Sequence, residues 1–282
     1  MTAVLAPEVP DSIGGRPPFR LAAIDIDGTL LGPDGTISAA NAAAIARLLA
    51  CGVQVVLASG RSHANMLPYQ RALGLRGPII SAQGAVVRDS DGHLIAEYAL
   101  PVESVRALTE AGRRAGVAVS HYRGDGIFIE HINAAMQFDQ SRNADPHVIV
   151  SDLLRTPAPA HKVMWIDAPA RIAQLAQTAP ASFAALAGIV QTDPEYLEFL
   201  PLGVDKATGV AAVARAAGID ATEVAAFGDG NNDVPMLAWA GWGVALAHAR
   251  PSAKAAARVV GPEGDPADAL ARAIACVWAP GV

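Results

Sequence analysis

The chain has 282 residues, of which 52% are hydrophobic and 17% are charged, and its formal net charge at pH 7 is −6. This length allows one large domain or two ordinary ones with separate cores, and we expect two. The sequence has no basic block, which argues against nucleic acid as the main partner, and its apolar runs fall short of the roughly 18 to 20 residues of a membrane span.

Residues 1–18 are rich in proline and contain no Lys or Arg before Arg16. We therefore expect a flexible N-terminal extension rather than a secretory signal. The two cysteines, Cys51 and Cys276, each lie in an apolar helical pattern, so they form no disulfide framework and are typical of a reducing compartment. These features predict a cytoplasmic protein.

A short apolar run over 21–24 ends in the sequence Asp25, Ile26, Asp27, Gly28, Thr29. The run predicts a buried parallel strand, and Asp25 and Asp27 would point the same way, roughly 6 to 7 Å apart. Such carboxylates repel unless a proton or a cation lies between them, and a hard ion such as Mg²⁺ prefers their oxygens. The alternative is a strand that ends in an ordinary Asp-Gly turn.

The next elements repeat this arrangement. Ser38 is a typical N-cap for a helix up to Cys51, and a strand over 53–58 runs into Ser59, Gly60 and Arg61. A strand-helix-strand unit implies parallel strands, whose carboxyl ends share one edge, so Ser59 should lie beside Asp25 and could bind a phosphate oxygen. The alternative is a Ser-Gly turn with an exposed arginine. A helix over 62–74 and a strand over 78–81 continue the alternation.

Between residues 87 and 199 the pattern changes to strands that alternate apolar and polar residues, as expected for a sheet with one wet face. We therefore predict an inserted α+β domain over 87–199, within a core formed by 19–86 and 200–282. Its strands are expected over 93–100, 117–122, 126–131, 162–167, 188–192 and 196–200, and its helices near 102–115, 133–141 and 169–178.

After the inserted region, Lys206 precedes a helix over 207–217, and a strand over 224–227 ends in Gly-Asp229-Gly-Asn-Asn232-Asp233. Asp229 at this strand tip could reach the same cation as Asp25. The alternatives are that Lys206 is simply exposed to solvent and that Asp233 is an ordinary N-cap of the helix over 234–240. Two short strands, over 241–247 and 258–260, and a helix over 266–278 complete the prediction.

With these four motifs in order, nearly the whole chain resembles the haloacid dehalogenase superfamily phosphatases, in particular the Cof-type subfamily with an inserted α/β (C2-type) cap domain. The resemblance implies an α/β fold with a Rossmann-like, doubly wound parallel-sheet core and an inserted α+β cap. It also implies that Asp25 is the nucleophile that forms an aspartyl-phosphate. Asp27 would be the general acid and base, and Lys206 would counter the charge on Asp25.

The resemblance further implies a Mg²⁺ site and a phosphate site. The metal would be held by Asp25, the main-chain carbonyl of Asp27, and Asp229, with Asp233 orienting its water shell. The residues implied in phosphate binding are Gly28, Thr29, Ser59, Gly60, Lys206 and Asn232. The chain departs from the family pattern at Ala207, where glycine is usual, and at Gln83, where asparagine is common.

The expected function is a Mg²⁺-dependent phosphatase acting on a small phosphorylated metabolite such as a sugar phosphate, nucleotide or cofactor phosphate. The alternatives are a phosphomutase acting on a hexose phosphate and a non-catalytic protein that binds a phosphorylated metabolite. The pair Asp25 and Asp27 argues against the latter, because binding needs only one of them. A dinucleotide site is not expected, since no strand leads into Gly-x-Gly-x-x-Gly. Both a monomer and a dimer remain open.

Overall fold

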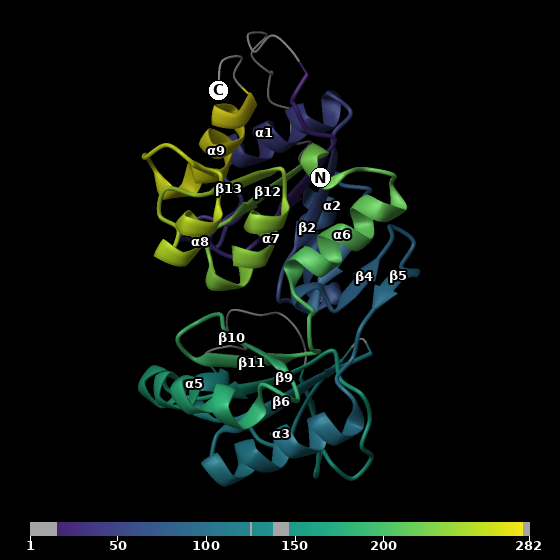
Figure 1. Ribbon diagram of the computed structural model, residues 1–282, viewed down its shortest axis with the longest axis vertical. Helices are drawn as coiled ribbons and strands as arrows, with labels where there is room; N and C mark the ends of the chain where they lie inside the picture. Colours follow the sequence, from purple (N-terminus) through teal and green to yellow (C-terminus); the bar gives the residue numbers. More distant parts are fainter. Residues whose placement is uncertain (1–15, 125, 138–146, 279–282) are drawn as a thin grey trace, which may run out of the picture.

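The computed structural model describes residues 16–124, 126–137 and 147–278, which form two β-sheets in two lobes, one above the other (Figure 1). The large sheet has the strand order β14-β13-β12-β1-β2-β3-β4-β5. Its strands are β1 (Leu21–Ile24), β2 (Gln54–Ala58), β3 (Ile79–Ser81), β4 (Val86–Arg88), β5 (Leu94–Glu97), β12 (Val224–Gly228), β13 (Trp242–Ala245) and β14 (Val259–Val260).

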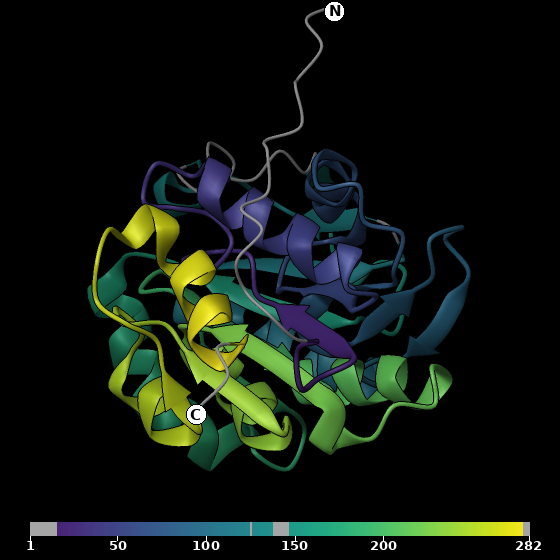
Figure 2. The same ribbon diagram turned by 90° about the horizontal axis from the view of Figure 1, so that it is seen from above.

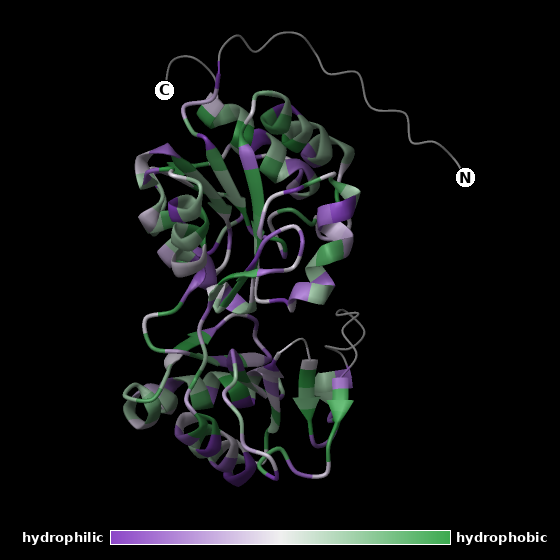
Figure 3. Cartoon of the chain, turned by 90° about the vertical axis from the view of Figure 1, so that its right-hand side faces the viewer, coloured by the Kyte–Doolittle hydropathy of each residue, from purple (hydrophilic) through white to green (hydrophobic). Residues whose placement is uncertain are grey.

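Helices cover both faces of the large sheet (Figure 2). One face carries α1 (Ala39–Ala50), α2 (His63–Ala72) and α9 (Ala269–Trp278), and the other carries α6 (Lys206–Ala216), α7 (Val234–Trp239) and α8 (Pro251–Ala256). These helices have both hydrophobic and hydrophilic residues (Figure 3). Strand β1 shows why its sequence is continuously apolar. Leu21 packs on one side and Ala22 on the other, and both are fully buried.

The small sheet has the strand order β10-β11-β9-β6-β7-β8, in which every pair is antiparallel except β7 with β8. Its strands are β6 (Ala118–Arg123), β7 (Gly126–Ile129), β8 (His147–Ile149), β9 (Lys162–Ile166), β10 (Gly188–Gln191) and β11 (Tyr196–Leu200). Helices α3 (Val102–Ala115) and α5 (Pro169–Phe183) pack on Val163 and Trp165 of β9. Lys162 and Met164 lie on the opposite side of β9 and line a pocket between the lobes.

The predicted α/β core with an inserted α+β region is confirmed, with one correction to how the segments pair. Strands β4 and β5 extend the large sheet as an antiparallel hairpin on β3, although the sequence assigned residues from 87 onward to the inserted region. The alternating pattern of a strand does not reveal its partner, because pairing with β3 depends on how the chain turns at Gly84. Strand β8 was not predicted.

Two predictions fall partly or mainly outside the described residues. The helix expected over 133–141 is observed over 134–137, and the rest of it lies outside the described part. Most of the expected N-terminal extension, 1–18, also lies outside it. Among the helices that the structure describes, none combines the length and apolar character that crossing a membrane requires.

Candidate active site

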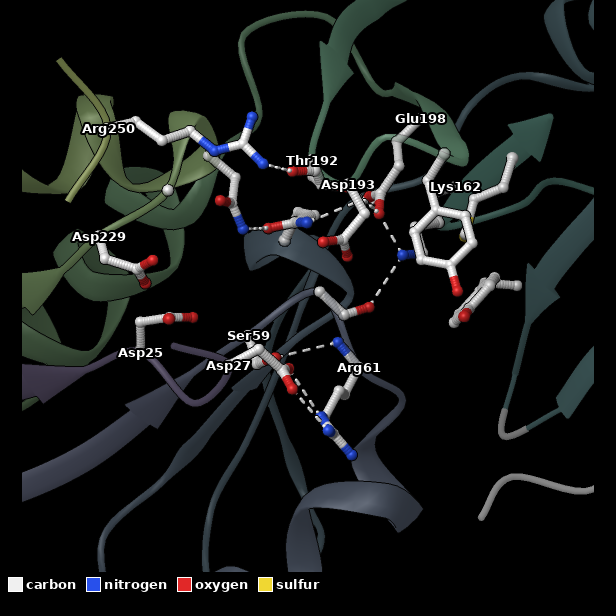
Figure 4. Close-up of a pocket in the computed structure, with 17 residues that line it drawn as sticks. Asp25, Asp27, Ser59, Arg61, Lys162, Thr192, Asp193, Glu198, Asp229 and Arg250 are labelled. Carbon is white, nitrogen blue, oxygen red and sulfur yellow. Dashed lines mark hydrogen bonds and ion pairs between the residues drawn. The ribbon is translucent and has the colours of Figure 1, made fainter. Parts of the chain in front are cut away.

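Three parallel strands bring Asp25, Ser59 and Asp229 to one edge of the large sheet. Strand β1 pairs with β2 on one side and β12 on the other, and each residue directly follows the end of its strand. The register is held past the strand by the Asp25 backbone N–H, which donates to the Phe227 carbonyl at 3.0 Å. All three line the pocket between the lobes, and Figure 4 shows Asp25 and Asp229 side by side. The predicted juxtaposition is therefore observed.

Lys206 is fully buried and binds two carboxylates of the site. Its Nζ donates to Asp25 Oδ1 at 2.5 Å and to Asp233 Oδ1 at 2.7 Å. Lys206 is the first residue of α6, which starts at a capping box formed by Asp205 and Thr208. A lysine near a helix N-terminus is disfavoured by the helix dipole, and here the two carboxylates offset that effect. The alternative of an exposed lysine is wrong.

Burial and mutual repulsion shift the titration of these groups. Burial raises the pKa of Asp25 well above its ordinary value; Asp233 raises it further, while Lys206 opposes the shift. Burial and Asp233 raise the pKa of Asp229 to about 6. Burial lowers the pKa of Lys206, but the carboxylates of Asp233 and Asp25 outweigh it, so the pKa lies above its ordinary value. Burial and repulsion therefore disfavour the ionised forms of Asp25 and Asp229, although Lys206 opposes both shifts.

The oxygens of Asp25, Asp229 and Asp233 form a donor set that fits a hard divalent cation. One ligand atom from each lies within 4.8 Å of the others. Both oxygens of Asp233 are already engaged, one by Lys206 and one by the backbone N–H groups of Asp229 and Gly230, each at 2.9 Å. Among the described residues, the second oxygens of Asp25 and Asp229 have no such partner. Direct coordination is therefore favoured for these two, with Asp233 orienting the loop.

Gly28 and Thr29 lie behind the pocket, where they position Asp229. The Thr29 hydroxyl donates to Asp229 Oδ1 at 3.0 Å. Gly28 has φ +82°, and a Cβ there would lie 2.6 Å from Asp229 Oδ2. This close approach requires glycine. Of the residues that the resemblance implied in phosphate binding, Ser59, Gly60 and Asn232 line the pocket itself, whereas Gly28, Thr29 and Lys206 do not.

Asp27 lines the same pocket but lies outside the carboxylate cluster, because its side chain turns toward Arg61 (Figure 4). The Arg61 guanidinium donates to both of its oxygens, at 2.8 and 2.6 Å. Arg61 is also anchored by Asn65 at 2.9 Å, and its side chain is only 10% exposed. Burial opposes the charge of Arg61, but the bond to Asp27 and the charges of Asp27, Tyr69 and Asp25 together outweigh it and raise the pKa of Arg61. The alternative of an exposed Arg61 is wrong.

The sequence analysis did not identify the residues that close the pocket. They come from the strands and the hairpin of the small sheet and from the loop before α8: Tyr122, Lys162, Met164, Thr192, Asp193, Tyr196, Glu198 and Arg250. Lys162 and Glu198 form a buried ion pair, with Nζ and Oε2 3.1 Å apart (Figure 4). A lysine and a glutamate within otherwise apolar strands were the available signal.

A profile of the haloacid dehalogenase-like hydrolases matches residues 22–274, which is most of the chain. The chain belongs to the haloacid dehalogenase-like hydrolase family. The sequence-based assignment to this family is confirmed, and with it the expectation of a hydrolase.

Several known proteins match along most of their length. A relative from Serratia proteamaculans, named HMP-PP phosphatase, is 30% identical over 237 residues, which is 84% of this chain and 86% of the relative. The crystal structure of a haloacid dehalogenase-like hydrolase from Bacteroides thetaiotaomicron is 27% identical, with a TM-score of 0.80 over 92% of this chain and 99% of that chain. A subclass IIB sugar phosphatase shares the fold, at 24% identity and a TM-score of 0.78, over 91% of this chain and 98% of that chain.

Proposed function

We propose that the chain is a Mg²⁺-dependent phosphatase that hydrolyses a small phosphorylated metabolite through an aspartyl-phosphate on Asp25. One observation carries this proposal. Asp25 lies 4% exposed between Lys206 and Asp229, while Asp27, two residues later, faces the same pocket from a separate ion pair. This arrangement supports two carboxylates with different roles. The name of the Serratia relative, HMP-PP phosphatase, supports a phosphorylated small molecule as substrate.

The reaction would proceed in two steps, formation of the aspartyl-phosphate and its hydrolysis. An oxygen of Asp25 attacks phosphorus, the bond from phosphorus to the leaving oxygen breaks, and Asp27 gives that oxygen a proton. Asp27 then takes a proton from water, whose oxygen attacks phosphorus and breaks the bond to Asp25. Because Arg61 is also anchored by Asn65, it stays in place to pair with Asp27 whenever that carboxylate is ionised.

The other site residues would hold the phosphoryl group and balance charge. Ser59, the main chain of Gly60, and Asn232 would contact it directly, a role that their position in the pocket lining supports. Mg²⁺, held by Asp25, Asp229 and the Asp27 carbonyl, would offset the charge of the phosphoryl oxygens. Lys206 would favour the ionised form of Asp25, and Thr29 would keep Asp229 in position.

The test of this function is phosphate release from sugar phosphates, nucleotides, flavin mononucleotide and pyridoxal phosphate, with and without Mg²⁺. We expect release from at least one compound, its loss on chelation, and its recovery when Mg²⁺ is added back. Equal release with and without the metal would contradict the metal-dependent mechanism. Silence across the panel, or exchange of phosphate between positions of a hexose phosphate, would instead favour a binding protein or a mutase.

Asp27→Asn should slow turnover by about 10²- to 10⁴-fold, because the amide can neither protonate the leaving group nor activate water. A poor leaving group should suffer more than p-nitrophenol, which leaves without a proton, so the two substrates together report the lost acid. The matched control is Asp34→Asn, an exposed aspartate of the following loop whose carboxylate accepts hydrogen bonds from Thr36. A rate equal to wild type on both substrates would place the acid elsewhere.

A further inference from the structure

Gln83 is buried between the two lobes in a backbone conformation that glycine usually adopts. It lies in the turn between β3 and β4, is 2% exposed, and has φ 60° and ψ 31°. Its backbone N–H donates to the Ser59 carbonyl at 3.0 Å, which fixes the turn against the loop that follows β2. Residues other than glycine are uncommon in this region, and such conformations persist where the surrounding structure holds them.

The Gln83 side chain connects the core to the cap through one continuous chain of hydrogen bonds. Its Oε1 accepts from Asn232 Nδ2 at 3.1 Å, and its Nε2 donates to Glu198 Oε2 at 3.2 Å. Lys162 Nζ then binds the same oxygen of Glu198 at 3.1 Å and donates to the Gly60 carbonyl at 2.9 Å. These hydrogen bonds thus lead from Asn232 of the core, through Glu198 and Lys162 of the cap, and back to Gly60 of the core.

The chemistry of these groups fixes which end of each amide donates a hydrogen bond and which end accepts one. An ionised carboxylate only accepts hydrogen bonds, so the side of the Gln83 amide that faces Glu198 must be its NH₂ group. The Gln83 oxygen therefore faces Asn232, and the NH₂ group of Asn232 must face that oxygen. Asn232 Oδ1 lies on the other side, against Gly230, where a Cβ would come within 2.5 Å of it. One N–H of Asn232 is used by Gln83, and no group within the described part of the chain accepts the second, which leaves it for a ligand.

We propose that Gln83 is a positioning residue that lets Glu198 set the orientation of the Asn232 amide, so that Asn232 presents an N–H to the phosphoryl group. This inference rests on the proposed function. The alternative orientation would place the Asn232 oxygen, an acceptor, against an anion. Because Glu198 comes from β11 of the cap, the donor is oriented only when the cap lies on the core.

The test measures the affinity of the protein for inorganic phosphate in the presence of Mg²⁺, by calorimetry, in a double-mutant cycle. Asn232→Ala and Gln83→Met should each weaken binding by roughly tenfold, the cost of one hydrogen bond to a charged group. Methionine has a similar length and is unbranched, so it suits the same backbone. The double variant should bind no more weakly than Asn232→Ala alone, because both changes remove the same contact.

The matched control is Gln70→Met, which removes the amide of another buried glutamine whose Nε2 binds the Gly77 carbonyl far from the pocket. It should leave phosphate affinity unchanged. Gln83→Asn provides a second route if the methionine variant does not fold: one methylene shorter, it cannot reach both partners and should also weaken binding without adding to Asn232→Ala. Thermal melting shows whether each variant is folded.

Several results would overturn the proposal and separate it from the proposed function. If Asn232→Ala weakens binding but the Gln83 variants do not, Gln83 does not orient Asn232, although Asn232 still binds phosphate. We call the proposed action of Glu198 on Asn232 through Gln83 the relay. Losses that add in the double variant would mean that Gln83 acts through something other than Asn232. Unchanged affinity in Asn232→Ala would remove the contact that the relay is meant to orient. No binding by the wild type, with silence across the substrate panel, would overturn the proposed function and the relay together.

Discussion

Asp25→Asn should lower the rate of phosphate release by about 10⁴-fold or more while leaving the protein folded. An amide is a very poor nucleophile, so the covalent step is lost, although the side chain keeps its shape. Folding should not suffer, because burial already raises the pKa of Asp25 and thus penalises its ionised form. Asp233 remains to pair with Lys206. We therefore expect a melting temperature equal to or above that of wild type.

The measurement pairs phosphate release with mass spectrometry of the intact protein quenched in acid during turnover. The wild type should carry a fraction of covalent phosphoryl adduct, and Asp25→Asn should carry none. The matched control, Asp91→Asn, changes an exposed aspartate in the β4–β5 turn and should behave as wild type in both assays. Substantial turnover or a persistent adduct in Asp25→Asn would mean that another group takes the phosphoryl.

The position of Asp25, Ser59 and Asp229 could be predicted because it depends on local patterns and one general rule. Short apolar runs predict parallel strands, and the carboxyl ends of parallel strands share an edge. No contact between distant residues has to be known for this step. Lys206 does not follow a strand of this sheet, so only the family resemblance placed it at the site, and its full burial between Asp25 and Asp233 depends on the capped start of α6.

The side of the pocket formed by the small sheet could not be predicted, because it depends on how the two sheets face each other. The alternation in β9 and β11 indicates that Lys162 and Glu198 share one side of their strands, but not that this side meets the core. The alternative of an exposed Arg61 stayed open in the sequence for a related reason. Its partner Asp27 is 34 residues away, and only the folded loop brings them together. The β4–β5 hairpin joins the large sheet because the chain turns back sharply after β3, and the alternation of apolar and polar residues does not reveal that turn.

Lys206→Met should both inactivate and strongly destabilise the protein. The variant leaves Asp25 and Asp233 buried without their cation, and breaking a buried pair in this way typically costs about 3 to 5 kcal/mol of unfolding free energy. Turnover should fall as well, since a protonated Asp25 is not a nucleophile. The matched control is Lys254→Met in α8, which removes a partly exposed lysine charge and should leave melting temperature and turnover nearly unchanged.

The destabilisation by Lys206→Met should depend on pH with a definite sign. In the wild type the pKa of Lys206 is raised, so its contribution is fully present below its unfolded pKa and is lost only as the pH rises through the folded value. In the variant, Asp25, whose pKa is already raised by burial, loses the group that opposed the shift and holds its proton more tightly when folded than when unfolded. The stability of the variant should therefore fall as the pH rises above the pKa that Asp25 has in the unfolded protein.

Melting curves at about pH 5 and pH 8 should show a larger difference in melting temperature from wild type at pH 8 than at pH 5. A gap that is equal at both, or larger at pH 5, would mean that Lys206 does not act by neutralising these carboxylates.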